Sequence, residues 1–272
     1  MRSPLNYLGG KSLLAGTIVP LIPEDHVCYC EPFCGAAWVF FTKAPSKLEV
    51  INDRDCELVT FWRVIQHHLE EFLRYFKYAV VSRRIFELEN KKDPSTLTDI
   101  QRAVRYFYIQ RLAFGGKPVD RTFGATMTRP TGLNISTVEE TLLDVHWRLE
   151  RVTIECLDAI ECVTRYDRPT TFFYLDPPYY ETVGYAVPWG PADFERLRDR
   201  LQGIQGRFIL SLNDVPAVRD MFKAFHVRRV STKYSLANGA KSNNGRTEPR
   251  SEVLISNFDT RALPPRTPKD AE

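Results

Sequence analysis

A short motif with one carboxylate, two prolines and one aromatic ring is the most specific chemical feature of the sequence. Asp176-Pro177-Pro178-Tyr179 directly follows the apolar run 172–175, which is typical of a buried strand. Two successive prolines remove two backbone donors and fix φ, so they leave a rigid ledge of carbonyl acceptors beside one carboxylate. Such a ledge suits an amino group whose two N–H bonds must be held. A plain turn that ends the strand is the alternative, since Asp-Pro is common there.

A second motif, Glu31-Pro32-Phe33-Cys34-Gly35-Ala36-Ala37, follows a predicted strand at 27–31 and overlaps the start of a predicted helix at 35–42. A turn with a small residue lets the backbone approach a ligand closely, and the following helix offers its N-terminus. This arrangement is typical of nucleotide sites, although it is neither the dinucleotide G-x-G-x-x-G pattern nor a phosphate P-loop. A tight turn without a ligand is the alternative.

Two shorter segments also carry residues that could contact a nucleotide. Asn52-Asp53 follows the predicted strand 48–51. An acidic residue at this place in an α/β sheet is the usual partner of ribose hydroxyls, with a helix cap as the alternative role for Asp53. Near the N-terminus, Asn6-Tyr7-Leu8-Gly9-Gly10-Lys11 combines paired glycines with two side chains that could reach a ligand. A simple turn before a helix is the alternative there.

The elements that must position these motifs alternate between strand and helix at both ends of the chain. Strands are predicted at 27–31, 48–51, 152–156, 171–175, 207–212 and 251–257. Helices are predicted at 11–22, 35–42, from Cys56 onward, and at 193–202. Strand-helix alternation implies a parallel sheet covered by helices. We therefore expect a split α/β domain made of residues 1–65 and 151–260.

The middle of the chain, residues 66–150, is predicted to be mainly helical. Thr98-Asp99-Ile100-Gln101 and Ser136-Thr137-Val138-Glu139 both fit the capping-box pattern and predict helix starts. Between them, residues 115–134 are rich in Gly, Pro and Thr, which predicts a long loop or hairpin. We therefore expect residues 66–150 to form an inserted domain. The proline-containing end of the chain, 261–272, is expected to be a loose tail.

Positive charge is concentrated in two loop-rich stretches. The whole chain carries 37 Lys and Arg against 34 Asp and Glu, a formal net charge of +3. Residues 101–135 hold six basic groups and one acidic group, and residues 231–250 hold four and one. Basic loops suit phosphate contacts, with an ordinary solvated surface as the alternative.

Composition and spacing exclude several classes of protein. A hydrophobic content of 43% over 272 residues supports a real core and excludes wholesale disorder. The uncharged run 12–23 is shorter than the ~20 apolar residues that a membrane-spanning helix needs. Prolines interrupt this run and Glu24-Asp25 follows it, which argues against a signal peptide. We therefore expect a cytoplasmic protein without a membrane segment.

The cysteines and histidines show no metal-ligand spacing. No C-x-x-C occurs, so the P-C-x-x-C ligands of zinc deaminases are absent. We therefore expect no metal site. Buried, reduced thiols are expected at all six cysteines, namely Cys28, Cys30, Cys34, Cys56, Cys156 and Cys162.

Taken in order, the motifs resemble those of the Dam-like family of adenine-specific DNA methyltransferases. The family pattern has an aromatic-x-G-G-K start, an E-P-F-x-G loop, an Asp after the second strand, and D-P-P-Y. The resemblance extends over residues 4–258, and Ser211-Leu212-Asn213 and the segment 250–257 also resemble family features. Family members usually carry Gly at the position of Ala37, and many carry Lys at that of Asn6.

The resemblance implies a Rossmann-like, S-adenosylmethionine-dependent methyltransferase sheet with an inserted, mainly helical target-recognition domain. It implies S-adenosylmethionine as cofactor and double-stranded DNA as partner. The catalytic residues would be Asp176, Pro177, Pro178 and Tyr179. The cofactor would contact Tyr7, Gly10, Lys11, Glu31, Phe33, Gly35, Asp53, Asp158 and Asp176, with a helix N-cap as the alternative role of Asp158. The DNA would contact Lys117, Arg121, Arg129, Lys241 and Arg246.

The implied chemistry is orientation of a poor nucleophile. The lone pair of adenine's amino group is delocalised into the ring, so the nitrogen must be held in line with the sulfonium methyl. Asp176 and the Pro177 carbonyl can each accept one amino N–H. Because the amino group is buried in a duplex, the base must be flipped out, and it can then stack on Tyr179.

Two other functions stay open at this point. One is an RNA adenine amino-methyltransferase, against which the whole-chain resemblance to DNA enzymes speaks. The other is a catalytically inactive DNA-binding relic, against which the intact D-P-P-Y speaks. Methylation of protein glutamine is disfavoured, because that chemistry typically has Asn in place of Asp176. A cognate restriction endonuclease is a partner that the resemblance leaves open.

Overall fold

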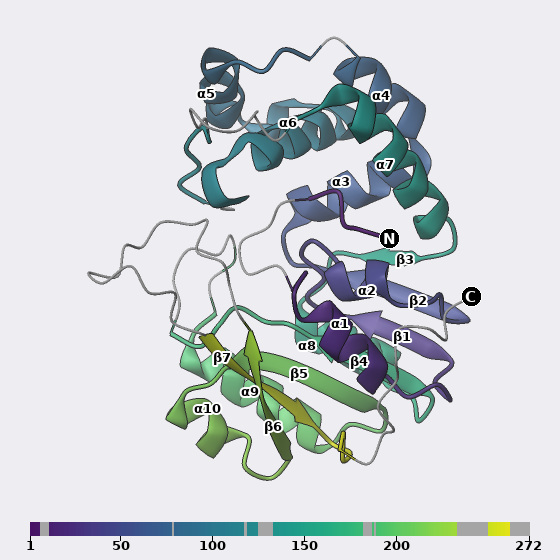
Figure 1. Cartoon of the computed structure of the whole chain (residues 1–272), viewed down its shortest axis with the longest axis vertical. Helices are drawn as coiled ribbons and strands as arrows, with labels where there is room; N and C mark the ends of the chain where they lie inside the picture. Colours follow the sequence, from purple (N-terminus) through teal and green to yellow (C-terminus); the bar gives the residue numbers. More distant parts are fainter. Residues whose placement is uncertain are drawn as a thin grey trace.

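A seven-stranded sheet with the order β3-β2-β1-β4-β5-β7-β6 forms the centre of the protein (Figure 1). The computed structural model describes residues 1–5, 11–77, 79–116, 119–124, 133–181, 187, 189–232 and 250–261. The strands are β1 Cys28–Glu31, β2 Leu48–Asn52, β3 Thr153–Glu155, β4 Thr171–Leu175, β5 Arg207–Asn213, β6 His226–Thr232 and β7 Arg250–Ser256. The first five strands of the chain pair in parallel, and β7 is antiparallel to β5 and β6. The expected α/β fold is confirmed, and β6 is a strand that the sequence pattern missed.

Helices cover both faces of the sheet and form a separate layer beyond β3 (Figure 1). Those against the sheet are α1 Ala15–Ile18, α2 Trp38–Thr42, α8 Ala159–Tyr166, α9 Pro191–Gln202 and α10 Pro216–Met221. The layer beyond β3, called the helical layer below, consists of α3 Cys56–His67, α4 Leu69–Phe76, α5 Arg83–Lys91, α6 Asp99–Leu112 and α7 Ile135–Leu149. Short 3-10 turns are η1 Val19–Leu21, η2 Pro94–Thr96 and η3 Phe114–Gly116. The predicted helix 11–22 is therefore only a turn followed by α1 and η1.

The central strand β4 is buried on both faces, which explains its continuous apolar sequence. Phe172 and Tyr174 belong to the core that also contains α1, α2 and the helical layer. Phe173 and Leu175 belong to the second core, against α8, α9 and α10. Successive side chains of a strand point to opposite faces, and a strand covered on both sides is apolar throughout. The end of β4 is thereby held rigidly in the middle of the molecule.

The sheet changes direction of winding between β1 and β4. The chain leaves β1 toward α2 on one face, whereas it leaves β4 toward α9 on the other face. The two strands are nevertheless parallel neighbours, with Cys30 paired to Phe173. The loops after them diverge and leave a crevice at their carboxyl ends. Open α/β sheets bind ligands at such a switch point.

The helical layer contains one predicted helix start that is confirmed and one that is wrong. Thr98 and Gln101 form a complete capping box at the start of α6. In contrast, α7 already begins at Ile135, because the Asn134 carbonyl accepts from the Val138 amide at 3.0 Å. The helix start predicted at Ser136 therefore lies within the first turn of α7.

The helical layer shares its core with one face of the sheet. Phe61 of α3 stacks on Phe107 of α6 with ring centroids 5.4 Å apart, and Phe72 of α4 lies 5.7 Å from Phe107. These rings belong to the same buried cluster as Phe172 of β4. Phe123, a described residue of the predicted loop 115–134, forms an antiparallel bridge with Ala113, which precedes the loop. The layer is thus anchored to the sheet through α3.

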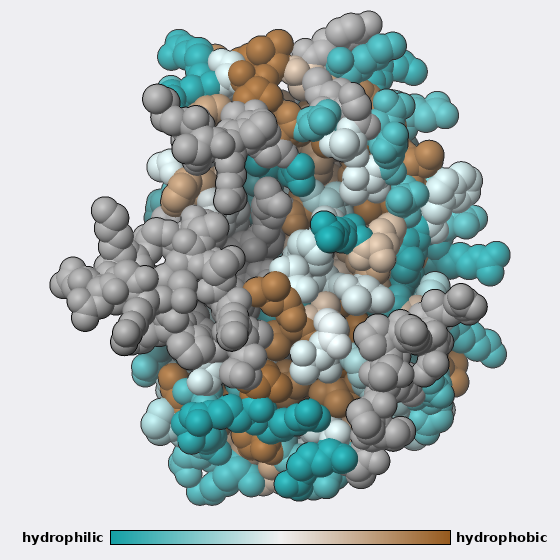
Figure 2. Space-filling model, in the orientation of Figure 1, coloured by the Kyte–Doolittle hydropathy of each residue, from teal (hydrophilic) through white to brown (hydrophobic). Residues whose placement is uncertain are grey.

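The visible surface is mostly hydrophilic or mixed, with hydrophobic residues exposed at its upper end near α5 (Figure 2). Val80 and Ile85 are large exposed hydrophobic residues there. They line a groove between α4, α5 and α6 together with Tyr75 and Val104. In the described part of the chain, no helix has the length and apolar character needed to cross a bilayer.

Two cysteines contradict the expectation that all thiols are reduced. Cys56 and Cys156 form a disulfide, whereas the free and buried thiols are those of Cys28, Cys30, Cys34 and Cys162. The reason lies in the sheet topology. Because β2 and β3 pair in parallel, the residues that follow both strands lie side by side. The two cysteines are 100 residues apart in the chain, so local spacing carries no sign of their pairing.

We expect this disulfide to stabilise the fold, because it closes a loop of 100 residues in the unfolded chain. Reduction should lower the free energy of unfolding by about 2–4 kcal/mol. Denaturant unfolding with and without reductant measures this change. The double variant Cys56→Ser, Cys156→Ser is the control, since its stability should not respond to reductant. Equal stability of the oxidised and reduced wild type would contradict the expectation.

Candidate active site

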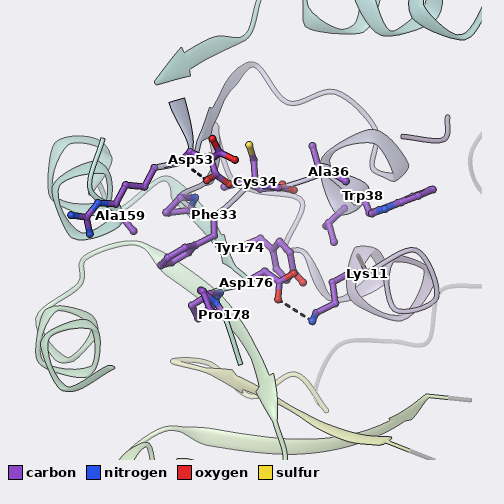
Figure 3. A pocket seen from close by; sticks show the side chains of 18 of the residues that line it. Lys11, Phe33, Cys34, Ala36, Trp38, Asp53, Ala159, Tyr174, Asp176 and Pro178 are labelled. Carbon is purple, nitrogen blue, oxygen red and sulfur yellow. Dashed lines mark hydrogen bonds and ion pairs between the residues drawn. The ribbon is translucent and has the colours of Figure 1, made fainter. Parts of the chain in front are cut away.

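A cavity opens at the carboxyl ends of β1, β2 and β4 and gathers motifs from distant parts of the chain (Figure 3). The predicted site residues that line it are Lys11, Glu31, Phe33, Gly35, Asp53, Asp176, Pro177 and Pro178. Lining residues that the sequence analysis did not assign include Trp38, Tyr174, Val187 and Trp189. Trp189 packs edge-on against Phe33, with ring centroids 5.0 Å apart.

The Asp176 carboxylate has one oxygen committed to the protein. Its Oδ1 accepts from the Ser211 hydroxyl at 2.9 Å and lies 3.0 Å from the Lys11 ammonium (Figure 3). Among the described residues, none donates to Oδ2, and the side chain is 20% exposed. Burial raises the pKa of Asp176, and the positive charge of Lys11 counteracts this. The carboxylate is therefore held in one orientation and keeps an acceptor for a ligand.

The end of β5 holds both ends of the D-P-P-Y segment. Ser211 joins Asp176 to the Tyr174 hydroxyl, which is 3.0 Å away. Two residues further, the Asn213 side chain accepts from the Tyr180 amide at 2.9 Å and donates to its carbonyl at 3.2 Å. Ser211 and Asn213 share one face of the strand. Their positioning role was missed by sequence reasoning, although two polar residues at alternate positions of a strand end are a visible signal.

Tyr179 lies beside the cavity but does not line it. Its hydroxyl donates to Glu252 of β7 at 2.5 Å and accepts from Lys11 at 3.0 Å. The sequence analysis noted segment 250–257 only as a family-like feature and assigned no role to Glu252. Tyr7 and Gly10, which were predicted to edge the same pocket, lie outside the described residues.

The turn after β1 uses two residues with left-handed backbone. Gly35 has φ 46° and Ala37 has φ 53°. Glycine adopts this region freely, whereas a side chain costs about 1–2 kcal/mol there. This explains why family members usually carry Gly where Ala37 stands. It also explains why α2 begins only at Trp38 and not at the predicted Gly35.

Asp53 links the two loops that face the cavity. Its Oδ2 accepts from the Gly35 amide at 2.9 Å, and its Oδ1 accepts from the Asp55 amide at 3.0 Å. Burial raises the pKa of Asp53 to about 6. The N-cap of α3 is Asp55, whose side chain accepts from the Glu57 and Leu58 amides. The alternative role of Asp53 as a helix cap is therefore wrong.

Carboxylates dominate the charged groups of the cavity wall. Glu31, at the end of β1, is buried and accepts from the Tyr29 hydroxyl at 2.5 Å. Burial raises the pKa of Glu31 to about 8. Asp53, Asp55 and Asp176 line the same space, while Lys11 is paired with Asp176. Such a wall favours a ligand that carries positive charge.

Two predicted contact residues, Asp158 and Arg121, lie outside the lining of the cavity. Asp158 does not line the cavity: its side chain caps α8 by accepting from the Ile160 amide at 3.0 Å, as the alternative interpretation had it. Arg121 is half-buried, with its guanidinium 5.6 Å from the ring centroid of Tyr106. The remaining predicted DNA contacts, which lie outside the described residues, are Lys117, Arg129, Lys241 and Arg246.

Within the described ranges, no group of three or more His, Cys, Asp or Glu side chains is arranged to hold a metal ion. Asp53 and Asp176 are instead paired with backbone amides, a hydroxyl and Lys11, while Arg54, which also lines the cavity, pairs with Asp158.

Comparison with known proteins identifies the family. Residues 7–236 match the D12 class N6 adenine-specific DNA methyltransferases. The chain belongs to this family. It is therefore an adenine-specific DNA methyltransferase, as the resemblance of its motifs implied. Duplex DNA is its substrate.

Similar curated proteins are methyltransferases of bacteria and of a virus. The Type II methyltransferase M1.LlaDCHI of Lactococcus lactis subsp. cremoris is 25% identical, over 95% of this chain and 96% of its own length. The Type II methyltransferase M.CviBI of Paramecium bursaria Chlorella virus NC1A is 21% identical over 90% and 94%. The modification methylase StsI of Streptococcus sanguinis is 24% identical, over 97% of this chain and 44% of its own length.

Solved structures with partial likeness include a precorrin 8w decarboxylase of Methanobacterium thermoautotrophicum and a SAM-dependent O-methyltransferase of Thermotoga maritima. The first has a TM-score of 0.42 and 12% identity, over 90% of this chain and 88% of its own. The second has a TM-score of 0.39 and 11% identity, over 90% and 64%.

The cofactor of this methyltransferase is S-adenosylmethionine, and the cavity fits its chemistry. The molecule carries a sulfonium and an ammonium, which suit the carboxylates of Asp53 and Asp176. Its ribose hydroxyls suit an acceptor such as Asp53, whose two oxygens are already oriented by backbone amides. When bound, the cofactor supplies an electrophilic methyl carbon.

We expect cofactor affinity to fall as the pH drops through about 6, because protonation of Asp53 then removes its charge. Asp53→Asn should weaken binding by about 10-fold at pH 7.5 and flatten this limb of the pH dependence. Calorimetric titration with S-adenosylmethionine between pH 5 and 8 measures both effects. Asp220→Asn, an exposed site on α10, is the control. Unchanged affinity of Asp53→Asn would contradict the assignment.

Proposed function

We propose that this methyltransferase modifies the exocyclic amino group of adenine at specific sites in duplex DNA, after flipping the base out of the helix. The observation that carries the proposal is the set of contacts of Asp176 at the end of β4. Its Oδ1 accepts a hydrogen bond from Ser211 and pairs with Lys11. This arrangement supports a fixed acceptor at Oδ2 for an amino group that enters the cavity.

Holding the amine is the main catalytic task of the protein. We assign one amino N–H to Oδ2 of Asp176 and the other to the carbonyl of Pro177. Two acceptors on a rigid segment orient the nitrogen lone pair toward the methyl donor and favour pyramidal geometry. The nitrogen would form a bond to the methyl carbon as the sulfur–methyl bond breaks, the sulfonium would leave as a neutral thioether, and the amine would release one proton to solvent. No covalent bond between DNA and protein is needed.

Flipping the base brings its amino group within reach of a cavity that lies at the end of a sheet. Extrusion costs a few kcal/mol of lost stacking and pairing. Stacking on an aromatic ring returns about 1–3 kcal/mol, a role that we assign to Tyr179. Pro178 and Trp189 supply further apolar surface in the cavity wall.

Target recognition is assigned to residues 66–150, with residues 1–65 and 151–260 as the catalytic domain. The layer of α3 to α7 at one end of the sheet supports this division (Figure 1). Its basic stretch 101–135 carries a net charge of +5 and suits DNA phosphates. Part of α3 belongs to the first segment, so the boundary runs through that helix.

The names of the relatives support a place in restriction and modification. Two are Type II methyltransferases and one is a modification methylase. We therefore propose a cognate restriction endonuclease as a partner and the cytoplasm as the compartment in which the DNA is modified. RNA as a substrate is less favoured, since the family description names DNA. An inactive relic is less favoured because Asp176 keeps its supporting contacts.

We expect Asp176→Asn to lower kcat by at least about 10²-fold, because the Asn amide has a single acceptor oxygen and a donor NH2 in place of the second carboxylate oxygen. Transfer of labelled methyl from S-adenosylmethionine to adenine in duplex DNA measures the loss. Asp167→Asn is the matched control: Asp167 is buried before β4, at the opposite end of the same strand, and pairs with Arg200 at 2.7 Å. Near-normal transfer by Asp176→Asn would show that this residue does not hold the amine.

We expect Arg121→Gln to weaken DNA binding because one phosphate contact is lost. The slope of log affinity against log salt should become shallower by about 1. Binding of a duplex at several salt concentrations measures the slope. Lys223→Ala, an exposed cation just after α10, is the control. An unchanged slope for Arg121→Gln would argue against this residue as a DNA contact.

A further inference from the structure

A buried cluster of charged side chains next to the cavity contains a second carboxylate, that of Glu252, to which no role in the reaction has been assigned. The Lys11 ammonium lies 3.0 Å from Asp176 Oδ1 and 3.3 Å from Glu252 Oε2. The Tyr179 hydroxyl bridges the same pair, accepting from Lys11 at 3.0 Å and donating to Glu252 Oε1 at 2.5 Å. Lys11 and Glu252 are only 3% and 1% exposed. One lysine therefore serves two carboxylates in a place closed to water.

The position of Glu252 on β7 explains how it reaches this cluster. Glu252 is paired with Asn213 of β5, and Leu254 with Ser211. Cross-strand partners point to the same face of a sheet, so Glu252 lies on the face that carries Ser211 and Asn213. Those two residues hold Asp176 and the backbone of Tyr180. Glu252 adds the contact to the side chain between them, that of Tyr179.

Through its charge, Glu252 also affects the positions of Lys11 and Tyr179, in addition to any effect on the stability of the fold. Glu252 and Asp176 share the Lys11 ammonium, which lies on the Oδ1 side of Asp176. Without the attraction of Glu252, this ammonium would shift toward Oδ2 of Asp176 and compete there with the amino group of a substrate, since both are donors. Loss of the Glu252 carboxylate would also remove the acceptor of the Tyr179 hydroxyl and loosen the orientation of the ring.

We propose that Glu252 is a positioning residue for methyl transfer, which keeps Lys11 on the Oδ1 side of Asp176 and fixes the Tyr179 ring for the flipped base. The inference rests on the proposed function, because it acts through the amine acceptor and the stacking ring named there. Glu252 does not touch the reacting atoms. Its effect should therefore appear in the chemical step and leave the binding of the cofactor unchanged.

The test is Glu252→Gln, which keeps the shape of the side chain and one acceptor for Tyr179 but removes the charge beside Lys11. We expect kcat for adenine methylation to fall by about 10²-fold, as for a misplacement near the reacting centre. The KM for S-adenosylmethionine should stay within about 2-fold of wild type, since the lost interaction is not one of cofactor binding. Steady-state kinetics with a duplex substrate measure both values.

The pH profile supplies a second measurement that a merely structural role would not move. The groups that face Asp176 are Lys11 from the N-terminal segment, Glu31 at the end of β1, Tyr174 on β4, Ser211 on β5 and Glu252 on β7. Burial raises the pKa of Asp176, Lys11 lowers it, and Glu252 raises it. Removal of the Glu252 charge should lower this pKa. The acid limb of kcat, which requires ionised Asp176, should therefore move to lower pH.

The matched control is Glu49→Gln. Glu49 is also buried, and it pairs with Lys43 at 2.5 Å and with Arg148, but it lies near the start of β2, away from the cavity. We expect a loss of stability in this variant with an unchanged acid limb. Tyr179→Phe is the second variant, which keeps the Glu252–Lys11 pair and removes only the bridging hydroxyl. It should lower kcat by about 10-fold, the effect of one charged hydrogen bond.

Wild-type methylation of adenine is measured first, so that failure of the proposed function is seen separately. With an active wild type, a lower kcat and a shifted acid limb in Glu252→Gln support the inference. A wild-type kcat in that variant would overturn it. A loss of kcat without movement of the acid limb would also overturn it. Should Glu252→Gln fail to fold, a wild-type kcat in Tyr179→Phe overturns the inference by itself.

Discussion

A carboxylate that lies mostly out of water at the end of β4 needs partners for one oxygen and open space at the other. Burial disfavours its charged form, so nearby donors must offset that cost. Ser211 and Lys11 do this at Oδ1 of Asp176. Lys11 is itself buried and is balanced by Glu252. The site therefore depends on the N-terminal segment, β4, β5 and β7 at the same time, which is why its residues are spread over the whole chain.

The order of the strands leaves a cavity beside this carboxylate. β1 and β4 are parallel neighbours whose following segments leave toward opposite faces, so their carboxyl ends are left open to a ligand. Backbone amides from the turn after β1 and from the start of α3 orient Asp53. The wall that results is rich in carboxylates and suits a cationic cofactor. Rigidity comes from β4, which is covered on both faces by apolar side chains.

Local patterns predicted those features whose causes are local. The apolar run of β4 and the motif after it, the strands β1 and β2, and the capping box at Thr98 all depend on neighbouring residues. The predictions were wrong where a helix starts at a different residue from the one that the pattern favours, or where a strand has no clear pattern. Asn134 begins the hydrogen bonding of α7 two residues before the predicted cap at Ser136. The left-handed turn at Gly35 and Ala37 delays α2, and no residue pattern predicted β6.

The sequence by itself determined the chemical groups and their places at strand ends, because the hydrophobic period and the prolines act within a few residues. It therefore predicted an α/β sheet with a ligand site around Asp176, and the resemblance of the motifs to a known family implied a methyltransferase. Only the tertiary structure decided which groups meet. The disulfide between Cys56 and Cys156 and the contact of Glu252 with Lys11 and Tyr179 join distant segments. Their physical cause is the order of the strands, which sets long-range neighbours that no local spacing encodes.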